Sequence, residues 1–412
     1  MRALFISTRL AGTDGVSLES KKLARVLTRL GFECFDCAGE GSDSARIIPE
    51  MHFQDPVALA LGERAFSGTE PDVGLLEAID ARAAFLEERL LEAMNDISPD
   101  LLVLQNVWAI PMQLPLASAL AAVVVRSGLP CLSHEHDYYW ERSRFRTSRI
   151  PGFLERYFPF HSGNVRHLCI NSLAQRALQT RRGIHATLVP NVFDFTTSAP
   201  GIDPYNVDFR DAVGLSEGQR LILQPTRVIP RKGIELAIEL LAELADPGNV
   251  LVITHQAGDE GFDYLHRLQR LAREHRVDLR YLASLIGKRG DQHGVDKRYT
   301  LWDSYPHADF VTYPSFYEGF GNALLETIYF RKPALVNRYA VYRADIAPKG
   351  FRFIESDGRI TPRTVGRVQE LLDDTEAQRE MTEHNYRLAG RHYSLEALES
   401  YLSPELRALG LV

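Results

Sequence analysis

The sequence lacks the long apolar runs that carry a chain across a membrane. No stretch approaches the roughly 20 apolar residues that a membrane-spanning helix needs. Near the start, the apolar segment Ala3–Ser7 is short and is soon followed by Arg9, Asp14 and Glu19. That pattern favours a buried first strand over a secretory signal peptide. The sequence therefore predicts a cytoplasmic protein with no transmembrane segment.

Cysteine is also scarce. The four cysteines in 412 residues are too few for disulfides to stabilise a chain of this length. Cys34 and Cys37 have the spacing of a redox or metal-binding half-site, but no second pair of metal ligands accompanies them. We therefore interpret both as half-buried residues of a strand, and we expect no metal site.

Neither an excess of positive charge nor a dinucleotide fingerprint is present. The formal net charge of −7 argues against a general nucleic-acid-binding protein. No G-x-G-x-x-G pattern follows any predicted strand, which disfavours a dinucleotide-dependent dehydrogenase. Apolar residues make up 45% of the chain and charged residues 25%, a globular composition. A chain of 412 residues is too long for one hydrophobic core, so we expect two or three domains.

What the chain does contain is an alternation of short apolar strands with amphipathic helices, typical of parallel, doubly wound sheets. The linker-like segment Thr196–Pro204 interrupts it. We predict two Rossmann-like domains, residues 1–200 and 201–390, with a ligand cleft between them. A C-terminal helix, residues 391–412, is expected to pack back toward the first domain. The polar segment Gly39–Val73 is either a surface excursion near a site or a plain surface loop.

The predicted elements follow the apolar periodicity. In the first domain the strands are Ala3–Ser7, Phe32–Cys37, Leu101–Gln105 and Cys131–His134, and the helices are Ser17–Leu30, Ala81–Asn95 and Leu116–Ser127. In the second domain the strands are Leu221–Gln224, Val250–Thr254, Leu279–Leu282, Phe310–Tyr313, Ala334–Asn337 and Phe351–Ile354. Its helices are Gly233–Leu244, Asp263–His275, Leu301–Tyr305 and Asn322–Phe330, followed by polar helices from Thr361 to Leu409.

Two loops at predicted strand ends are suited to anions. The turn Gly12–Ser17 has two glycines that permit close backbone approach, and the helix after it presents backbone N–H groups to negative charge. A tight strand–helix turn would need glycine in any case. In the loop Gln224–Gly233, Arg227 and Lys232 precede a helix start, which suits a diphosphate. The alternative is a loop of solvated charges.

A third motif places Glu318 directly after a predicted strand and Glu326 in the helix that follows. This pair resembles the E-x7-E signature of the retaining GT-B glycosyltransferases of family 4, also called glycosyltransferase group 1. Arg227 and Lys232 resemble that family's diphosphate-binding pair, and Gly12–Val16 its N-terminal glycine loop. The resemblance covers nearly the whole chain. It implies a GT-B fold, a nucleotide-sugar co-substrate such as GDP-mannose or UDP-glucose, retention of anomeric configuration, and no cofactor or essential metal.

The resemblance also implies roles for individual residues. Glu326 would bind the ribose hydroxyls of the donor, and Glu318 would lie near its sugar ring. Arg227 and Lys232 would neutralise the leaving diphosphate in place of a metal. The implied donor-binding residues are Gly15, Arg227, Lys232, Glu318, Gly319, Phe320, Gly321, Asn322 and Glu326.

The segment Ser133–Arg142 holds two histidines after a first-domain strand. The family resemblance places a histidine beside the reacting sugar here. His136 followed by Asp137 matches best, and His134 is the alternative. The expected catalytic residues are His136, Glu318, Arg227 and Lys232.

Four arginines follow this histidine segment: Arg142, Arg144, Arg146 and Arg149. They form either a solvated basic loop or a subsite for an acceptor that bears a phosphate or carboxylate. The segment His136–Arg142 also resembles a subgroup that makes solutes of the mannosylglucosylglycerate kind. We therefore predict a small polar, anionic acceptor such as a glycerate glycoside. The residues expected to bind it are Asp14, Asp137, Arg142 and Arg144.

Other functions fit the same motifs. A sugar-nucleotide epimerase of this fold would cleave the donor without an acceptor, and a transferase of this family could act on a polysaccharide or a lipid-linked acceptor. A catalytically inactive nucleotide-sugar-binding protein is a further alternative. The motifs leave open the donor base, the sugar, the linkage and the oligomeric state.

Overall fold

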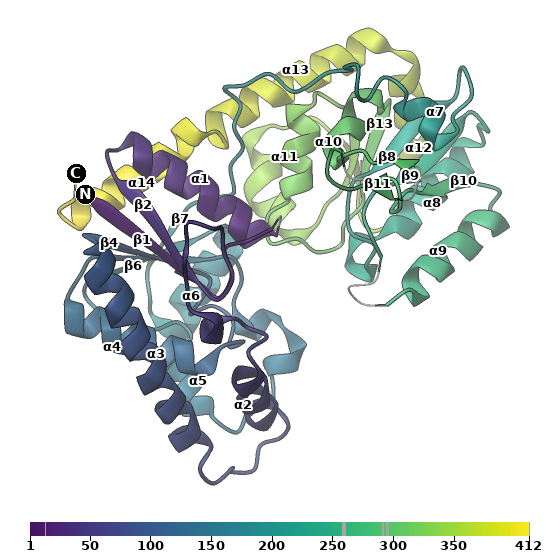
Figure 1. The fold of residues 1–412 in the computed structure, drawn as a ribbon. Helices are drawn as coiled ribbons and strands as arrows, with labels where there is room; N and C mark the ends of the chain where they lie inside the picture. Colours follow the sequence, from purple (N-terminus) through teal and green to yellow (C-terminus); the bar gives the residue numbers. More distant parts are fainter. Residues whose placement is uncertain (13, 258–260, 291, 294–295, 412) are drawn as a thin grey trace. The chain divides into compact units, whose positions relative to one another are not determined.

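A computed structural model describes residues 1–12, 14–257, 261–290, 292–293 and 296–411, drawn as a ribbon in Figure 1. The chain folds into two compact units. Unit 1 consists of Met1–Val192 together with Leu395–Val412, and unit 2 is Phe193–Ser394. Each unit contains a parallel sheet, seven strands in unit 1 and six in unit 2. Two Rossmann-like sheets are the GT-B arrangement that the sequence predicts.

Unit 1 has the strand order β3-β2-β1-β4-β5-β6-β7, with every neighbouring pair parallel. Apolar residues fill both faces of this sheet, as parallel sheets covered by helices require. The strands are β1 (Arg2–Ser7), β2 (Glu33–Ala38), β3 (Arg46–Ile47), β4 (Leu101–Gln105), β5 (Cys131–Glu135), β6 (Val165–Cys169) and β7 (Ala186–Leu188). The helices are α1 (Gly15–Arg29), α2 (Pro56–Phe66), α3 (Leu75–Ile97), α4 (Leu114–Ser127), α5 (Pro151–Tyr157), α6 (Ser172–Arg182) and α14 (Leu395–Ala408).

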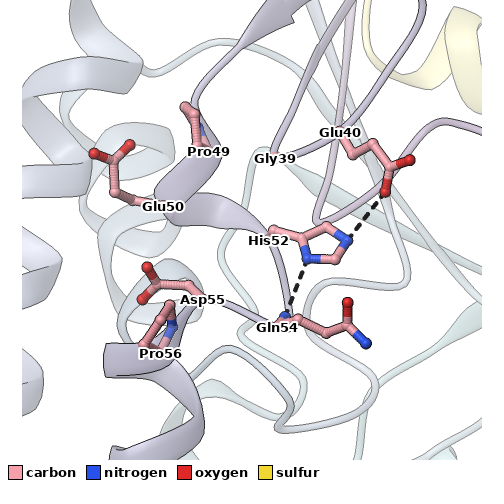
Figure 2. A pocket seen from close by; sticks show the side chains of 8 residues that line it. All are labelled: Gly39, Glu40, Pro49, Glu50, His52, Gln54, Asp55 and Pro56. Atoms are coloured by element: carbon pink, nitrogen blue, oxygen red, sulfur yellow. Dashed lines mark hydrogen bonds and ion pairs between the residues drawn. The ribbon is translucent and has the colours of Figure 1, made fainter.

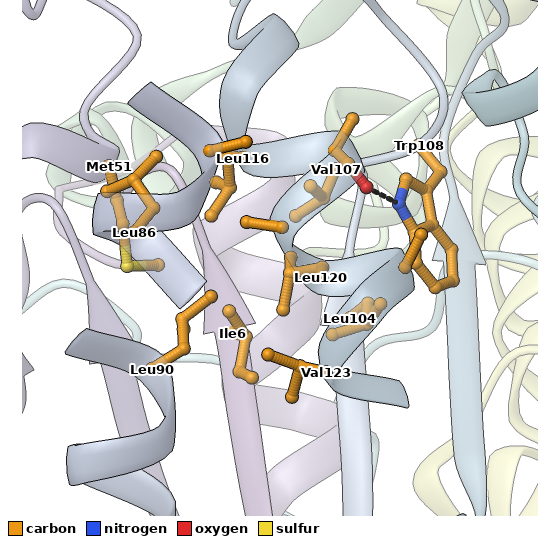
Figure 3. Packing of buried hydrophobic residues seen from close by; sticks show 14 of the residues in the cluster. Ile6, Met51, Leu86, Leu90, Leu104, Val107, Trp108, Leu116, Leu120 and Val123 are labelled. Carbon is orange, nitrogen blue, oxygen red and sulfur yellow. Dashed lines mark hydrogen bonds between the residues drawn. The ribbon is translucent and has the colours of Figure 1, made fainter. Parts of the chain in front are cut away.

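The core of unit 1 follows the alternation of side chains along each strand. Ile6 and Leu104 point to the face covered by α3 and α4, where Leu86 and Leu120 pack against them (Figure 3). The residues that alternate with these along each strand, such as Phe5 in β1 and Val103 in β4, point to the other face, where α1 and α14 pack. On the α3–α4 face, the buried indole of Trp108 donates a hydrogen bond to the carbonyl oxygen of Ala117 at 2.9 Å.

Unit 2 has the strand order β10-β9-β8-β13-β14-β15, again all parallel. The strands are β8 (Arg220–Gln224), β9 (Asn249–Ile253), β10 (Asp278–Tyr281), β13 (Phe310–Tyr313), β14 (Ala334–Asn337) and β15 (Ile354–Ser356), with a separate antiparallel pair, β11 (Gln292–His293) and β12 (Asp296–Lys297). The helices are α7 (Phe209–Val213), α8 (Ile234–Leu244), α9 (Asp263–Glu274), α10 (Leu301–Ser304), α11 (Asn322–Tyr329), α12 (Pro362–Asp373) and α13 (Thr375–His392).

The structure differs from the predicted elements in several places. The polar segment Gly39–Val73 contains the helix α2, which Asp55 caps and which buries Ala58, Leu61 and Ala65. Apolar residues at this spacing form a narrow stripe that the polar composition concealed. The sequence prediction also missed β6, α5, α6 and β7, and it placed the last strand of unit 2 three residues too early, at Phe351–Ile354.

The two closely spaced cysteines lie in β2. The chain has no disulfide among its cysteines: Cys34 is half-buried and Cys37 is buried. Burial raises the pKa of the Cys37 thiol to about 12, so it is not a reactive thiolate at ordinary pH. This arrangement agrees with their interpretation as strand residues.

Candidate active site

In unit 2, two loops at the carboxyl ends of neighbouring strands lie side by side. β8 and β13 are paired, so the loops that follow them, residues 225–233 and 314–321, leave the sheet at the same edge. The backbone N–H of Phe316 donates to the carbonyl oxygen of Arg231 at 2.8 Å and joins the loops. The cation motif and the first carboxylate of the E-x7-E motif are therefore neighbours, although 86 residues separate Lys232 from Glu318.

The carboxylate of Glu318 receives two cations from the other loop. Lys232 Nζ forms a hydrogen-bonded ion pair with Glu318 Oε1, and Arg231 Nη1 lies 3.1 Å from Oε2. Lys232 and Glu318 are 8% and 7% exposed. Burial alone would raise the pKa of Glu318, but the charges of Lys232 and Arg231 lower it below its usual value. Glu318 is thus a fixed negative charge held between two cations.

Lys232 is surrounded by further positive charge. Burial lowers its pKa, and repulsion from Arg231 and Arg227 acts in the same direction, while Glu318 opposes both. Arg227 itself is exposed. Sequence reasoning selected Arg227 and Lys232 and passed over Arg231, although all three stand in one run of six residues. What identifies Arg231 as part of this site is its contact with Glu318 in the other loop, which the sequence does not show.

Two glycines permit this close packing. Gly233 has φ +60°, and a Cβ there would lie 2.5 Å from the carbonyl oxygen of Pro314. Gly321 has φ +135°, and a Cβ would lie 2.7 Å from the hydroxyl of Tyr339, which donates to the carbonyl oxygen of Phe320. The Phe320 side chain is buried against Tyr393, so the segment before α11 offers a ligand its backbone rather than that ring.

Glu326, the second carboxylate, lies in α11 and is half-buried. Trp302 Nε1 donates to its Oε1 and the Tyr305 hydroxyl donates to its Oε2, both at 3.3 Å. Glu318 precedes the helix, which begins at Asn322. Glu318 therefore has two cations among its partners, and the Ser315 side chain helps them to lower its pKa, whereas Trp302 and Tyr305 provide Glu326 with neutral donors.

In unit 1 the strand ends of β4 and β5 position the histidines. Asn106 has φ +58°, uncommon for a residue with a side chain. Its backbone N–H donates to the His134 carbonyl oxygen, and its side-chain oxygen accepts from the His136 N–H, both at 2.9 Å. Asn106 thus fixes the chain where it leaves β5. Sequence reasoning missed this residue, because neither its backbone conformation nor its partner has a local sequence signal.

The structure separates the two candidate histidines by their surroundings. His134 is 3% exposed, and its Nδ1 lies 3.2 Å from the side-chain oxygen of Gln105. His136 is half-buried at the end of the strand, with its ring 4.7 Å from that of His134. Burial lowers the pKa of His134 to about 4, and burial together with the charges of His134 and Lys22 lowers the pKa of His136. Both rings are therefore neutral near pH 7.

A buried polar cluster is formed by the β5 residues on either side of His134, together with His167 of the neighbouring strand β6. The Ser133 hydroxyl donates to Glu135 Oε1, and His167 Nδ1 lies 3.6 Å from the same oxygen. Burial raises the pKa of Glu135, while His167 and Ser133 oppose that rise. Because all three side chains are buried, this cluster belongs to the interior beneath the strand end.

Comparisons with known proteins identify the family of this chain. The family model described as glycosyl transferases group 1 matches residues 207–388. Mannosylglucosylglycerate synthase of Thermotoga maritima is 32% identical over 98% of this chain and 100% of its own length. The chain belongs to the group 1 glycosyltransferases. The mannosylglucosylglycerate synthase of Petrotoga mobilis is 31% identical, over 84% of each chain.

Solved structures show the GT-B fold for this glycosyltransferase. A glycosyltransferase from Rickettsia africae superposes with a TM-score of 0.70 at 12% identity, covering 99% of this chain and 98% of that one. The sucrose-phosphate synthase of Thermosynechococcus elongatus superposes with a TM-score of 0.67 at 14% identity, covering 99% of each chain. At such low identity the similarity concerns the fold.

The residues predicted to bind the acceptor are partly engaged with one another in the glycosyltransferase. Arg142 Nε donates to Asp137 Oδ2 at 2.7 Å. Arg144 is exposed, with its guanidinium 4.4 Å from the ring centroid of Phe145. Arg149 is half-buried, and its backbone N–H donates to the carbonyl oxygen of Ala65. The structure therefore sets Arg149 apart from the exposed arginines of the run.

The glycine turn serves α1 directly. Asp14 is the N-cap, and its carboxylate accepts from the backbone N–H groups of Val16 and Ser17, each at 3.1 Å. Arg9 lies 3.0 Å from the same carboxylate. The expectation that these N–H groups are unpaired and open to a ligand is therefore wrong for Val16 and Ser17, because the Asp14 carboxylate already caps them. Gly15 is the first residue of α1, and Thr13 lies outside the described residues.

Unit 1 also contains an open hollow of about 480 Å³ that no predicted site residue lines. Its residues come from the segment between β2 and α2. Figure 2 shows the His52 ring between Glu40, whose Oε2 lies 3.3 Å from Nε2, and the backbone N–H of Gln54, which donates to Nδ1 at 3.2 Å. A Cβ at Gly39 would lie 2.2 Å from the His52 nitrogen, so this turn requires glycine.

Neither a metal-binding cluster nor a membrane-spanning helix occurs among the described residues. No group of three or more His, Cys, Asp or Glu side chains among these residues could hold a metal ion. Within the same residues, no helix is long and apolar enough to cross a bilayer.

Proposed function

We propose that this chain is a retaining, metal-independent mannosyltransferase of family 4. It transfers a mannosyl group from a nucleoside-diphosphate mannose, with GDP-mannose as the first candidate, to glucosylglycerate. The observation that carries this proposal is the 32% identity, over 98% of the chain, to an enzyme whose name states its product. A mannosylglucosylglycerate contains a sugar, a second sugar and a glycerate carboxylate, so the acceptor for a mannosyl group is a small anionic glycoside.

The donor side of this proposal rests on unit 2. Lys232 and Arg227 neutralise the leaving diphosphate, and the backbone of Gly319–Asn322 binds the sugar and phosphate. Glu318 lies near the sugar ring, and Glu326 accepts hydrogen bonds from the ribose hydroxyls. The buried Lys232–Glu318 pair supports these roles, because it holds a cation at the strand end before any ligand arrives. From unit 1, Gly15 completes the donor contacts.

The reaction exchanges one C1–O bond for another. The acceptor hydroxyl attacks C1 on the face from which the diphosphate leaves, the bond from C1 to the phosphate oxygen breaks, and the acceptor proton passes to that oxygen. The transition state resembles an oxocarbenium ion beside a developing anion, so fixed cations and dipoles stabilise it more than the ground state. His136, neutral near pH 7, contacts the transferring sugar as a hydrogen-bonding partner. No covalent nucleophile takes part.

The acceptor side rests on unit 1. Arg142 and Arg144 bind the glycerate carboxylate, and Asp137 binds acceptor hydroxyls. Asp14, which the sequence also assigned to the acceptor, is left out, because its carboxylate already accepts from the Val16 and Ser17 N–H groups, the Ser17 hydroxyl and Arg9. The Asp137–Arg142 ion pair supports this assignment. Asp137 follows His136 directly in the sequence, and its carboxylate holds the Arg142 guanidinium in a defined position.

Product analysis tests the proposal. Purified protein is incubated with GDP-mannose or UDP-glucose, with and without glucosylglycerate and EDTA. We expect mannosyl transfer that EDTA leaves largely intact, and proton NMR should show the donor's anomeric configuration in the early product. Inverted product or loss of activity with chelator would contradict the mechanism. Isomerised donor in the absence of acceptor would identify an epimerase.

The histidine assignment has its own test. His136→Ala should lower kcat far more than it weakens donor affinity, because the ring contacts the sugar as it reacts. His134→Ala should have neither effect to the same degree. Equal losses of kcat in both variants would remove the distinction between the two residues.

A further inference from the structure

The carboxylate of Glu326 is held by two hydrogen-bond donors from one short segment. Trp302 Nε1 reaches Oε1 and the Tyr305 hydroxyl reaches Oε2, each at 3.3 Å. Because each donor takes a different oxygen, together they set the plane of the carboxylate. Both residues are predicted from the sequence to lie in a helix but in no site, and the function proposed above assigns no role to either.

The two donor rings are fixed by aromatic packing. Trp302 lies 5.6 Å from the ring centroid of Phe330 and 5.7 Å from that of Tyr329. Tyr305 stacks on Phe330 at 4.6 Å with an interplanar angle of 4°. Tyr305 is fully buried, whereas Trp302 is 38% exposed. The N–H and O–H groups therefore point at Glu326 before any ligand binds.

The segment that carries both rings is itself anchored. Thr300 caps α10, and Asp303 at the third helical position completes a capping box. The Asp303 carboxylate is 1% exposed and accepts from Arg289 Nε at 3.2 Å and from Asn206 Nδ2 at 3.3 Å. These contacts tie α10 to Arg289 and Asn206 and so help to keep Trp302 and the adjoining Tyr305 in place.

We propose that Trp302 and Tyr305 are positioning residues that orient the Glu326 carboxylate toward the two ribose hydroxyls of the donor nucleotide. This inference rests on the proposed function, in which Glu326 binds the ribose. A carboxylate has about four acceptor sites, more than these two donors use. The indole N–H only donates, so it does not compete for the hydrogens of the ribose hydroxyls. The arrangement makes the site selective for ribonucleotides over deoxynucleotides.

Calorimetric titration of the full chain with GDP and with 2′,3′-dideoxy-GDP tests this role; the UDP pair replaces them if UDP binds the wild type more tightly. Trp302→Phe keeps an aromatic ring and removes the N–H, and Tyr305→Phe removes only the hydroxyl. We expect each variant to bind GDP about 3- to 10-fold more weakly, as loss of one hydrogen bond of ordinary net strength implies. Binding of the dideoxy nucleotide should change by less than about twofold, because it lacks the hydroxyls that Glu326 contacts.

Tyr329→Phe is the matched control. It removes a hydroxyl from the same aromatic group, where that hydroxyl donates to the Ser198 carbonyl oxygen at 3.0 Å. Both nucleotides should bind this variant as they bind the wild type. Melting temperatures check folding, and the partly exposed Trp302 decides the test alone if Tyr305→Phe does not fold.

Two results would overturn the positioning role: equal losses for GDP and the dideoxy nucleotide, or no loss for either. Glu326→Gln separates this failure from failure of the proposed function. If Glu326→Gln loses the preference for GDP while the two aromatic variants keep it, only the positioning role is wrong. If Glu326→Gln also keeps the preference, Glu326 does not bind the ribose, and the donor site of the proposed function fails with it.

Discussion

The buried polar groups at the strand ends carry opposite charges in unit 2, whereas those in unit 1 include neutral histidines. Lys232 and Glu318 are buried as a charged pair, with Arg231 adding a second cation. His134 and His136 have lowered pKa values and lose their charge through burial instead. The difference means that unit 2 holds fixed cations at its strand ends at ordinary pH, whereas unit 1 holds uncharged imidazoles.

Removing the central cation should give the largest effect. Lys232→Ala should reduce kcat/KM roughly 30- to 900-fold. This corresponds to about 2–4 kcal/mol of lost transition-state stabilisation, because in the proposed mechanism the cation faces the charge that develops in the transition state. Arg227→Ala should cost a similar amount of activity, and steady-state kinetics with the donor varied will measure both. Near-normal kcat/KM in the two variants would remove them from the site.

The Lys232 and Arg227 variants should differ in their free energy of unfolding. Lys232→Ala leaves the buried Glu318 carboxylate with Arg231 alone and should lower the free energy of unfolding, whereas Arg227 is exposed and its removal should not. The double variant Lys232→Met/Glu318→Gln should recover stability without recovering activity. Recovery of both would mean that the pair serves folding only.

Acid should weaken unit 1 through His134. Its pKa is about 4 in the folded state, against about 6.5 when unfolded, so the unfolded state binds more protons between these values. The contribution to stability is complete above pH 6.5 and is lost as the pH falls to 4, roughly 3 kcal/mol in all. Urea unfolding of the wild type should therefore lose that much more stability than His134→Gln over this range. Parallel pH profiles would contradict the neutral state of this histidine.

Two glycines with similar backbone angles should respond differently to alanine. Gly12 in unit 1 has φ +79°, and a Cβ there would have no neighbour within 4 Å. Gly12→Ala should cost only the left-handed strain, about 1 kcal/mol. At Gly233 the Cβ would also meet the Pro314 carbonyl oxygen, which is backbone and cannot swing aside, so Gly233→Ala should cost about 2 kcal/mol more. Equal melting temperatures of the two variants would show that the loops of unit 2 can separate freely.

The smallest effect should come from the exposed arginines of unit 1. Arg144→Gln should raise the acceptor KM several-fold, about 1 kcal/mol, and leave donor affinity unchanged. The effect should weaken with added salt, because exposed charges are screened over roughly 8–10 Å. Arg146→Gln, from the same exposed run, is the control. An unchanged acceptor KM in an Arg142/Arg144 double alanine variant would assign these two arginines to a solvated loop.

The features that could be predicted from the sequence are local ones, whereas the features that were missed depend on contacts between distant segments. The apolar strands were predictable because burial on both faces leaves a continuous run, as in Leu101–Gln105, whose predicted bounds match β4. The spacing of Glu318 and Glu326 is likewise local and visible. The contact of Arg231 with Glu318 depends on two loops distant in sequence, and the left-handed Asn106 depends on partners in β5. Such features arise only from the assembled sheet.

The return of the chain to unit 1 has a consequence for biosynthesis. α14 packs against α1 (Figure 1), and its Leu398, Leu402 and Leu406 belong to the same apolar cluster as Leu23 and Val26. Ribosomes add about 5–20 residues per second, so making unit 2 takes roughly 10–40 s. During that time residues 1–192 display an apolar face that only later residues can cover. Unit 1 is thus synthesised first but is completed only when α14 has been made. Until then its uncovered apolar face is a surface that chaperones can bind.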